Sequence, residues 1–272
     1  MGPQPHSPRA MTRRPHLHRA NSMLRGLHER HAVLPALSLL AVLAACSSPP
    51  TPAAQNPSPM VERSRAHARI DTAPPAGDRF TIEGLLSRPI AVYVPARAKG
   101  SPEATLLVHF NGAPYAAMHA AAAQTHPLVL ASVHLGSGSA VYERAFANAE
   151  MLGRIRQAVA DSITARRGSP VRLPATVLSA FSAGYGAVRA VLGNSEMDTT
   201  IAGVLLLDGL HVSYMPERTP LASGGVLDTA RLAPFLDFAE RALRGERRML
   251  VTHSEIFPGS FASTTETADY LL

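Results

Sequence analysis

Apolar runs alternate with amphipathic segments along the chain from about residue 80 onwards. Short runs rich in Val, Leu and Ile predict strands, because buried strands of a parallel sheet are apolar throughout. Segments whose apolar residues recur every three or four positions predict helices with one buried face. The predicted strands are residues 80–85, 89–95, 104–110, 127–133, 175–181, 201–207 and 248–252. The predicted helices are residues 116–123, 148–166, 186–192, 229–244 and 264–272.

The order of these elements indicates the fold class. Two strands come first, as in a hairpin, and strands and helices then alternate. This order predicts an α/β fold, with a mostly parallel sheet sandwiched by helices. In such sheets ligands bind at the carboxyl ends of the strands, so we expect the functional residues to follow the strands directly.

The first 78 residues follow another pattern. A basic stretch, residues 25–31, precedes 14 mostly apolar residues that end at Cys46, the only cysteine. This arrangement is typical of a signal peptide, and the apolar run is too short to span a bilayer. Seven prolines between residues 47 and 78 predict an extended spacer. We therefore expect an N-terminal extension with a signal peptide in residues 1–45, a linker in 46–78 and a folded domain in 79–272.

The segment Leu43-Ala44-Ala45-Cys46 resembles the lipobox of bacterial lipoproteins. The resemblance implies that Cys46 is lipidated and becomes the mature N-terminus, and that acyl chains hold the protein on a membrane of the cell envelope. Ser47 resembles the second residue of lipoproteins sorted to an outer membrane, where the domain would face the periplasm. A signal of ordinary length would start at Met23. The alternative is a buried helix followed by an inert cysteine.

The net charge of +6 suggests an acidic partner only at first sight. Residues 1–45 hold six Arg and one Glu, so the remainder is nearly neutral. Trp is absent and aromatic residues make up 5%, which disfavours stacking on single-stranded nucleic acid. We therefore expect no nucleic-acid partner.

The candidate chemistry centres on Ser182, in the segment Ala180-Phe181-Ser182-Ala183-Gly184 between a predicted strand and a predicted helix. A sharp strand-to-helix turn strains the residue at its apex, exposes its hydroxyl and needs small residues two positions to either side. The segment resembles the nucleophile elbow of alpha/beta-hydrolases, G-x-S-x-G, with Ala180 in place of the first glycine. The resemblance implies that Ser182 is the nucleophile of a serine hydrolase. The alternatives are an idle serine in a small-residue turn and a dinucleotide-binding loop, for which a third glycine is missing.

The same resemblance implies an oxyanion hole and an acid. One backbone N–H would come from Ala183, and a second from Gly112 or Ala113 in the loop after residues 104–110. Asp208 follows the strand 201–207 and is a candidate to orient a histidine. Glu255, past the strand 248–252, is the alternative acid. Asp208 could instead cap a turn.

The histidine base is where the chain departs from the family. The family places it on a loop after a last strand, whereas no further strand or histidine follows residues 248–252 and His253. His253 is the first candidate base because it lies at a strand end, and His211 is the second. Each could be an ordinary polar residue at a loop edge, and His109 is expected to be buried. We expect a chain one strand and one helix short of the family's sheet, nearly inactive and marginally stable.

Other classes of site leave no trace in the sequence. Neither a zinc-ligand pattern nor a phosphate-binding glycine-lysine loop is present, so we expect no metal and no cofactor. The leading interpretation is a lipid-anchored envelope serine hydrolase that cleaves a small-molecule carboxylic ester, or less readily an amide, through an acyl-enzyme. The alternative is a non-catalytic envelope lipoprotein that keeps the fold as a binding or structural module.

Overall fold

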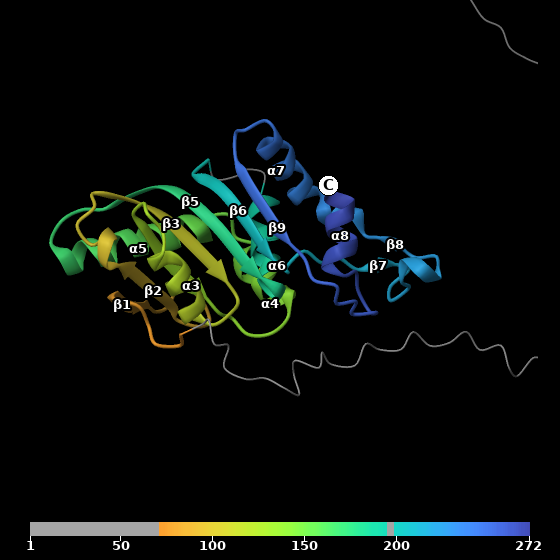
Figure 1. Ribbon diagram of the computed structural model, residues 1–272, viewed down its shortest axis with the longest axis horizontal. Coiled ribbons are helices and arrows are strands. Elements are labelled where there is room, and N and C mark those ends of the chain that lie inside the picture. Colours follow the sequence, from red (N-terminus) through yellow and green to blue (C-terminus); the bar gives the residue numbers. More distant parts are fainter. Residues whose placement is uncertain (1–70, 195–198) are drawn as a thin grey trace, which may run out of the picture. The chain divides into compact units, whose positions relative to one another are not determined.

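A computed structural model describes residues 71–194 and 199–272. Cys46, Met23 and the predicted signal peptide lie outside the described residues, as does most of the linker. Within the described part, a seven-stranded sheet runs in the order β1-β2-β4-β3-β5-β6-β9 (Figure 1). Its strands are β1 (Gly77–Ile82), β2 (Ile90–Pro95), β3 (Glu103–Phe110), β4 (Leu128–Val133), β5 (Arg172–Phe181), β6 (Ile201–Leu207) and β9 (Arg248–Thr252).

Helices connect these strands. They are α3 (Pro114–Ala122), α4 (Ser139–Phe146), α5 (Met151–Arg167), α6 (Tyr185–Leu192), α7 (Ala233–Leu243) and α8 (Thr264–Leu271). Short 3-10 turns are η1 (Ala96–Ala98), η2 (Ser182–Gly184), η3 (Leu221–Ser223) and η4 (Thr229–Leu232). Two short strands, β7 (Tyr214–Met215) and β8 (Val226–Leu227), pair with each other in a separate antiparallel ribbon.

The sheet is mostly parallel. β1 pairs with β2, and β2 with β4, in antiparallel fashion. From β4 onwards every neighbouring pair of strands is parallel. The predicted fold class, a mostly parallel sheet flanked by helices with a hairpin at its start, is confirmed.

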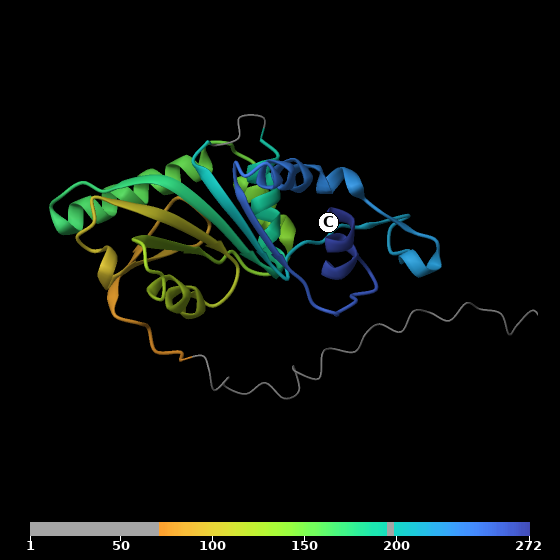
Figure 2. The same cartoon turned by 45° about the horizontal axis from the view of Figure 1, so that its top comes forward.

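Side chains of β2 and β4 alternate between two apolar clusters. One cluster contains Tyr93 and Leu130 together with Met118 of α3. The other contains Val92 and Ala131 together with residues of α4, α5, α6 and α7. Because successive strand residues point to opposite faces, α3 covers one face of the sheet and α4, α5, α6 and α7 cover the opposite face (Figure 2).

Several parts of the secondary structure differ from the prediction. The first strand is residues 77–82 and not 80–85, and the sequence did not predict the ribbon of β7 and β8. The sequence predicts a loop at residues 136–139 and no helix between residues 124 and 147, whereas α4 begins at Ser139. Gly138, with a φ of 87°, ends the loop directly before it. The predicted helix 229–244 is divided into η4 and α7. An eight-residue helix such as α4 spans too few turns for its period to stand out from the sequence.

β9 forms one edge of the sheet and, within the described residues, pairs only with β6. Its Leu250 side chain is 53% exposed. β9 is therefore a partly exposed edge strand. No helix in the described residues is long and apolar enough to cross a bilayer.

Candidate functional site

Ser182 lies at a tight turn directly after β5. Its φ of 46° is in the left-handed region, which costs a non-glycine residue about 1–2 kcal/mol. η2 and α6 follow it without an intervening loop. The strand-to-helix turn predicted at Ser182 is present, and the half-buried hydroxyl forms no hydrogen bond within the described residues.

Small residues allow this turn to pack closely. A Cβ at Gly184 would overlap the carbonyl oxygen of Phe110, at the end of β3. A Cβ at Gly186 would overlap the carbonyl oxygen of Ser139, where α6 crosses α4. The turn therefore depends on glycine at both positions.

The loop after β3 lies beside the Ser182 turn. Asn111, with a φ of 64°, donates from Nδ2 to the carbonyl oxygen of Phe181 at 3.0 Å. Tyr142 in turn donates to Asn111 Oδ1 at 3.2 Å. The amides of Gly112 and Ala113 donate no hydrogen bond within the described residues. The loop thus carries free donors beside the turn, although neither amide has an acceptor that would identify it as an oxyanion donor.

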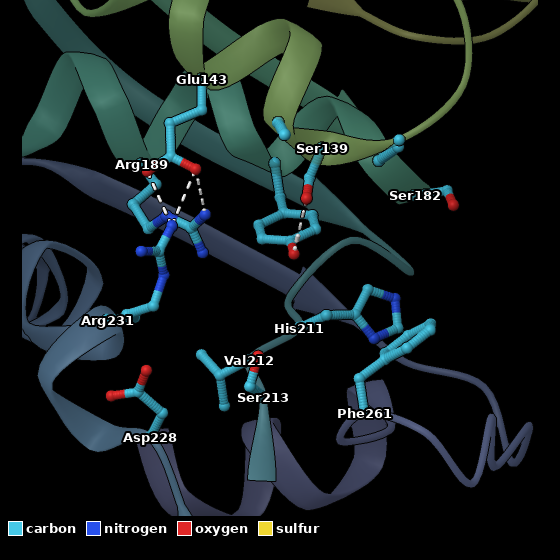
Figure 3. A pocket seen from close by; sticks show the side chains of 14 residues that line it. Ser139, Glu143, Ser182, Arg189, His211, Val212, Ser213, Asp228, Arg231 and Phe261 are labelled. Atoms are coloured by element: carbon cyan, nitrogen blue, oxygen red, sulfur yellow. Dashed lines mark hydrogen bonds and ion pairs between the residues drawn. The ribbon is translucent and has the colours of Figure 1, made fainter. Parts of the chain in front are cut away.

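A pocket of about 530 Å³ opens beside Ser182 (Figure 3). Its wall combines Ser182 and Ala183 with aromatic and charged side chains from α4, α6, η4 and the segment after β6. The remaining lining residues are Gly138, Ser139, Ala140, Glu143, Tyr185, Arg189, His211, Val212, Ser213, Asp228, Arg231 and Phe261. His211 is therefore the histidine that the structure brings to the same pocket as the predicted nucleophile.

The environment of His211 fixes which ring nitrogen is free. Its Nδ1 lies 2.9 Å from the carbonyl oxygen of Ala262, an acceptor that places the proton of the neutral ring on Nδ1. Nε2 then carries a lone pair. Burial lowers the pKa of His211, outweighing the Ala262 hydrogen bond and the negative charge of Asp208. The ring packs edge-on against Tyr185 and Phe261, so these contacts hold the imidazole in place.

Asp208 lies where it was predicted, at the carboxyl ends of the parallel strands and directly after β6, with a φ of 47°. Its carboxylate accepts hydrogen bonds from the amide and the hydroxyl of Ser254, both at 3.0 Å, and from the Thr264 hydroxyl at 2.6 Å. It makes no hydrogen bond to a histidine within the described residues. Asp208 thus ties the end of β6 to the segment between β9 and α8, and it acts on His211 only through its charge.

The other sequence candidates lie outside the pocket. Glu255 and His253 are both exposed after β9, and His253 Nδ1 lies 3.1 Å from the Thr265 hydroxyl. His109 is buried at the end of β3, as expected, with its Nδ1 3.0 Å from the Ser179 hydroxyl. Burial lowers the pKa of His109, which keeps it a neutral partner within the sheet.

Three charged residues of the pocket form ion pairs with one another. Glu143 accepts hydrogen bonds from Arg189 at 2.6 Å and from Arg231 at 2.8 Å. Burial raises the pKa of Glu143, but the two guanidinium groups outweigh that effect and the net shift is downward. In the described part of the chain, no three His, Cys, Asp or Glu side chains gather in a way that could hold a metal ion.

Sequence reasoning missed these charged residues and ranked His211 second. A usable signal for His211 was its position four residues past the carboxyl end of a parallel strand. Arg189 lies on α6, the helix that follows the Ser182 turn, four residues after Tyr185. This spacing places both side chains on one face of the helix, which was a usable signal for Arg189. Glu143 lies on α4, which the sequence did not predict at all.

No family model and no curated protein sequence matches the chain. Among solved structures, the ferric enterobactin esterase of Salmonella typhimurium aligns with a TM-score of 0.36 and 18% identity over 52% of this chain and 38% of its own. The enterobactin esterase of Shigella flexneri gives a TM-score of 0.39 and 14% identity over 65% of this chain and 55% of its own. The acylaminoacyl peptidase of Pyrococcus horikoshii gives 0.32 and 13%, over 51% and 24%. The matches thus span at most 55% of those solved chains, and likeness at this level carries no conclusion about activity.

Proposed function

We propose that this protein is a serine hydrolase that cleaves a carboxylic ester of a small molecule through an acyl-enzyme, with Ser182 as the nucleophile. The observation that carries the proposal is the left-handed backbone of Ser182 at a tight strand-to-helix turn on a pocket wall. Strain of this kind persists only where the surrounding structure holds it, and it is concentrated at functional sites. The turn is also the arrangement that exposes a nucleophilic hydroxyl.

The proposed mechanism uses His211 as the base. Ser182 Oγ attacks the ester carbonyl carbon while Nε2 of His211 takes the hydroxyl proton. The amide of Ala183, with that of Gly112 or Ala113, stabilises the oxyanion. The alcohol leaves with the proton from His211, and a water molecule, deprotonated by the same nitrogen, then hydrolyses the acyl-serine. In this mechanism the Ala262 carbonyl orients His211 and the charge of Asp208 favours the imidazolium, while Glu255 and His253 remain the sequence-based alternatives.

A fluorophosphonate probe tests the nucleophile and the base together. The wild-type protein should be labelled at Ser182, and Ser182→Ala should not be labelled. His211→Gln should label far more slowly, whereas His253→Gln, the matched control at an exposed histidine, should label like the wild type. Absence of labelling in the wild type would overturn the proposed activity. Slow labelling of the His253 variant alone would move the base to His253.

The proposal includes a location in the bacterial cell envelope. The lipobox resemblance at Cys46 supports a lipid anchor, with the domain of residues 79–272 facing the periplasm from the outer membrane through the linker 46–78. The acyl chains would be the contact with the membrane, and no nucleic-acid partner is expected. Metabolic palmitate labelling should disappear in Cys46→Ser; unchanged labelling of that variant would contradict the anchor.

A second candidate function is a non-catalytic binding module in the envelope. The bonding of Asp208 favours it, because Ser254 and Thr264 occupy the carboxylate that would otherwise orient a histidine. A protein of this kind would bind a ligand in the pocket without labelling at Ser182. The probe experiment therefore separates the two functions.

A further inference from the structure

One end of the pocket is formed by three charged side chains from three elements. Glu143 comes from α4, Arg189 from α6 and Arg231 from η4 (Figure 3). Glu143 Oε2 accepts from both guanidinium groups, at 2.6 Å from Arg189 and 2.8 Å from Arg231, and Oε1 accepts again from Arg231 at 2.8 Å. Two cations therefore share a single carboxylate.

Arg189 is the less compensated of the two cations. The residue is only 7% exposed, and its Nε is buried without an acceptor. Its guanidinium carbon lies 5.1 Å from the centre of the Tyr185 ring, which offsets part of the charge. Buried charges are normally paired and fully hydrogen-bonded, so this end of the pocket holds one positive charge more than its own acceptors balance.

Asp228 also lines the pocket but does not close this gap. It forms no ion pair with either arginine within the described residues, and its side chain caps no helix. The pocket lining holds two arginines and two carboxylates, so its formal charge is zero only when Asp228 is counted with Glu143. Its charge is thus separate from the arginine pair and opposes the binding of any anion near it.

We propose that Arg189 and Arg231 bind a carboxylate carried by the ligand of this pocket. A singly charged carboxylate matches the one unbalanced positive charge, and guanidinium groups bind its two oxygens through paired N–H donors. Because Ser182 lines the same pocket, the ligand is an ester whose acyl part ends in a free carboxylate, such as a half-ester of a dicarboxylic acid. The identification of this ligand as a substrate rests on the proposed function, whereas its binding does not.

Binding is measured in a Ser182→Ala background, in which no ester is consumed. The ligands are the para-nitrophenyl half-ester of adipic acid and the para-nitrophenyl ester of hexanoic acid, which differ at the far end of the acyl chain. We expect the charged ester to bind more tightly by roughly 10-fold to 100-fold, as hydrogen bonds between charged groups provide. Adding Arg231→Gln should remove most of this preference by weakening the binding of the charged ester.

Two further variants sharpen the test. Arg144→Gln removes one charge from an exposed side chain on the same helix as Glu143 but outside the pocket, so the preference should persist. Asp228→Asn should increase the preference by roughly 3-fold, because it removes a charge that opposes the anion. Equal unfolding midpoints of the variants would show that Arg231, which is 44% exposed, is not needed for folding.

The outcomes separate the two proposals. Equal binding of both esters, or a preference that survives Arg231→Gln, would overturn the carboxylate site whatever the labelling of Ser182. A preference that depends on Arg231, in a protein that no fluorophosphonate labels, would support the carboxylate site and overturn the hydrolase. A preference lost equally in Arg144→Gln would show a general charge effect and also overturn the site.

Discussion

The turns after β5 and β6 share one backbone conformation and use it in opposite ways. Ser182 and Asp208 are the first residues after neighbouring parallel strands, with φ values of 46° and 47°. Ser182 lines a pocket, and its hydroxyl forms no hydrogen bond within the described residues. The Asp208 carboxylate is bonded to Ser254 and Thr264. A strained turn thus presents a side chain at the carboxyl end of each strand. The surrounding residues determine whether that side chain is available for chemistry or is bonded in a way that stabilises the fold.

The largest expected effect tests the chemical role of the Ser182 turn. Ser182→Ala should lower kcat/KM for a short-chain para-nitrophenyl ester by roughly a thousandfold or more, because it removes the nucleophile. The free energy of unfolding should change by less than about 0.5 kcal/mol, since the hydroxyl makes no hydrogen bond to lose. Paired kinetic and urea-unfolding measurements check both statements. Residual activity near the wild-type level would show that another group attacks the ester.

Asp208→Ala tests the contribution of the Asp208 turn to stability. Three hydrogen bonds to the carboxylate disappear, so we expect a loss of about 2–4 kcal/mol in the free energy of unfolding. Glu255→Ala is the matched control, because that carboxylate is exposed and should change stability by less than about 0.5 kcal/mol. An Asp208 variant as stable as the control would mean that the bonds to Ser254 and Thr264 contribute nothing net.

Gly184→Ala tests why the Ser182 turn can form. The added methyl group would overlap the Phe110 carbonyl, so unfolding should become easier by about 1–3 kcal/mol and labelling of Ser182 should slow. Gly153→Ala, in the first turn of α5 with open space around it, should instead stabilise the protein by about 0.4–1 kcal/mol. Equal effects of the two substitutions would refute the close packing at Gly184.

The smallest effect concerns pH. Burial lowers the pKa of His211 from its ordinary value of 6.5, so above that pH the ring is neutral in both the folded and unfolded chain. As the pH falls below 6.5, His211 becomes protonated in the unfolded chain before it does so in the folded protein. The free energy of unfolding therefore decreases until the pH has fallen below the pKa of the folded state. The acid limb of kcat/KM should likewise lie below pH 6.5.

His211→Gln should flatten this stability loss between about pH 7 and about pH 5. Urea unfolding at several pH values measures the slope. Since His109 is also buried with a lowered pKa, part of the slope should remain in the His211 variant. An unchanged slope would show that His211 does not titrate in this range.

The sheet could be predicted from the sequence because its strands are continuous apolar runs, such as Ile201–Leu207, whose burial follows from composition alone. The Ser182 turn could also be located, since it needs small residues at fixed offsets from the apex. α4 could not, because its two most buried residues, Tyr142 and Phe146, are a single helical repeat apart and follow a glycine-serine loop.

The partners of the site residues lie far apart in sequence and were therefore not predictable. Asp208 meets Thr264 across 56 positions, and the Nδ1 partner of His211, Ala262, lies 51 positions away. A carboxylate or histidine that directly follows a predicted strand can be placed at the carboxyl ends of the strands from the sequence. Which group it then contacts depends on how the segment between β9 and α8 folds back, and no local pattern encodes that path.

The left-handed backbone at residue 182 also has a consequence for how the sequence can change over generations. Glycine adopts this conformation without steric strain, so Ser182→Gly would favour the folded state by about 1 kcal/mol or somewhat more. With a net stability of about 5–15 kcal/mol for a typical domain, such a gain is appreciable. Mutational drift in a lineage with no use for the hydroxyl would therefore move towards glycine, and serine would persist where selection on chemistry outweighs selection on stability.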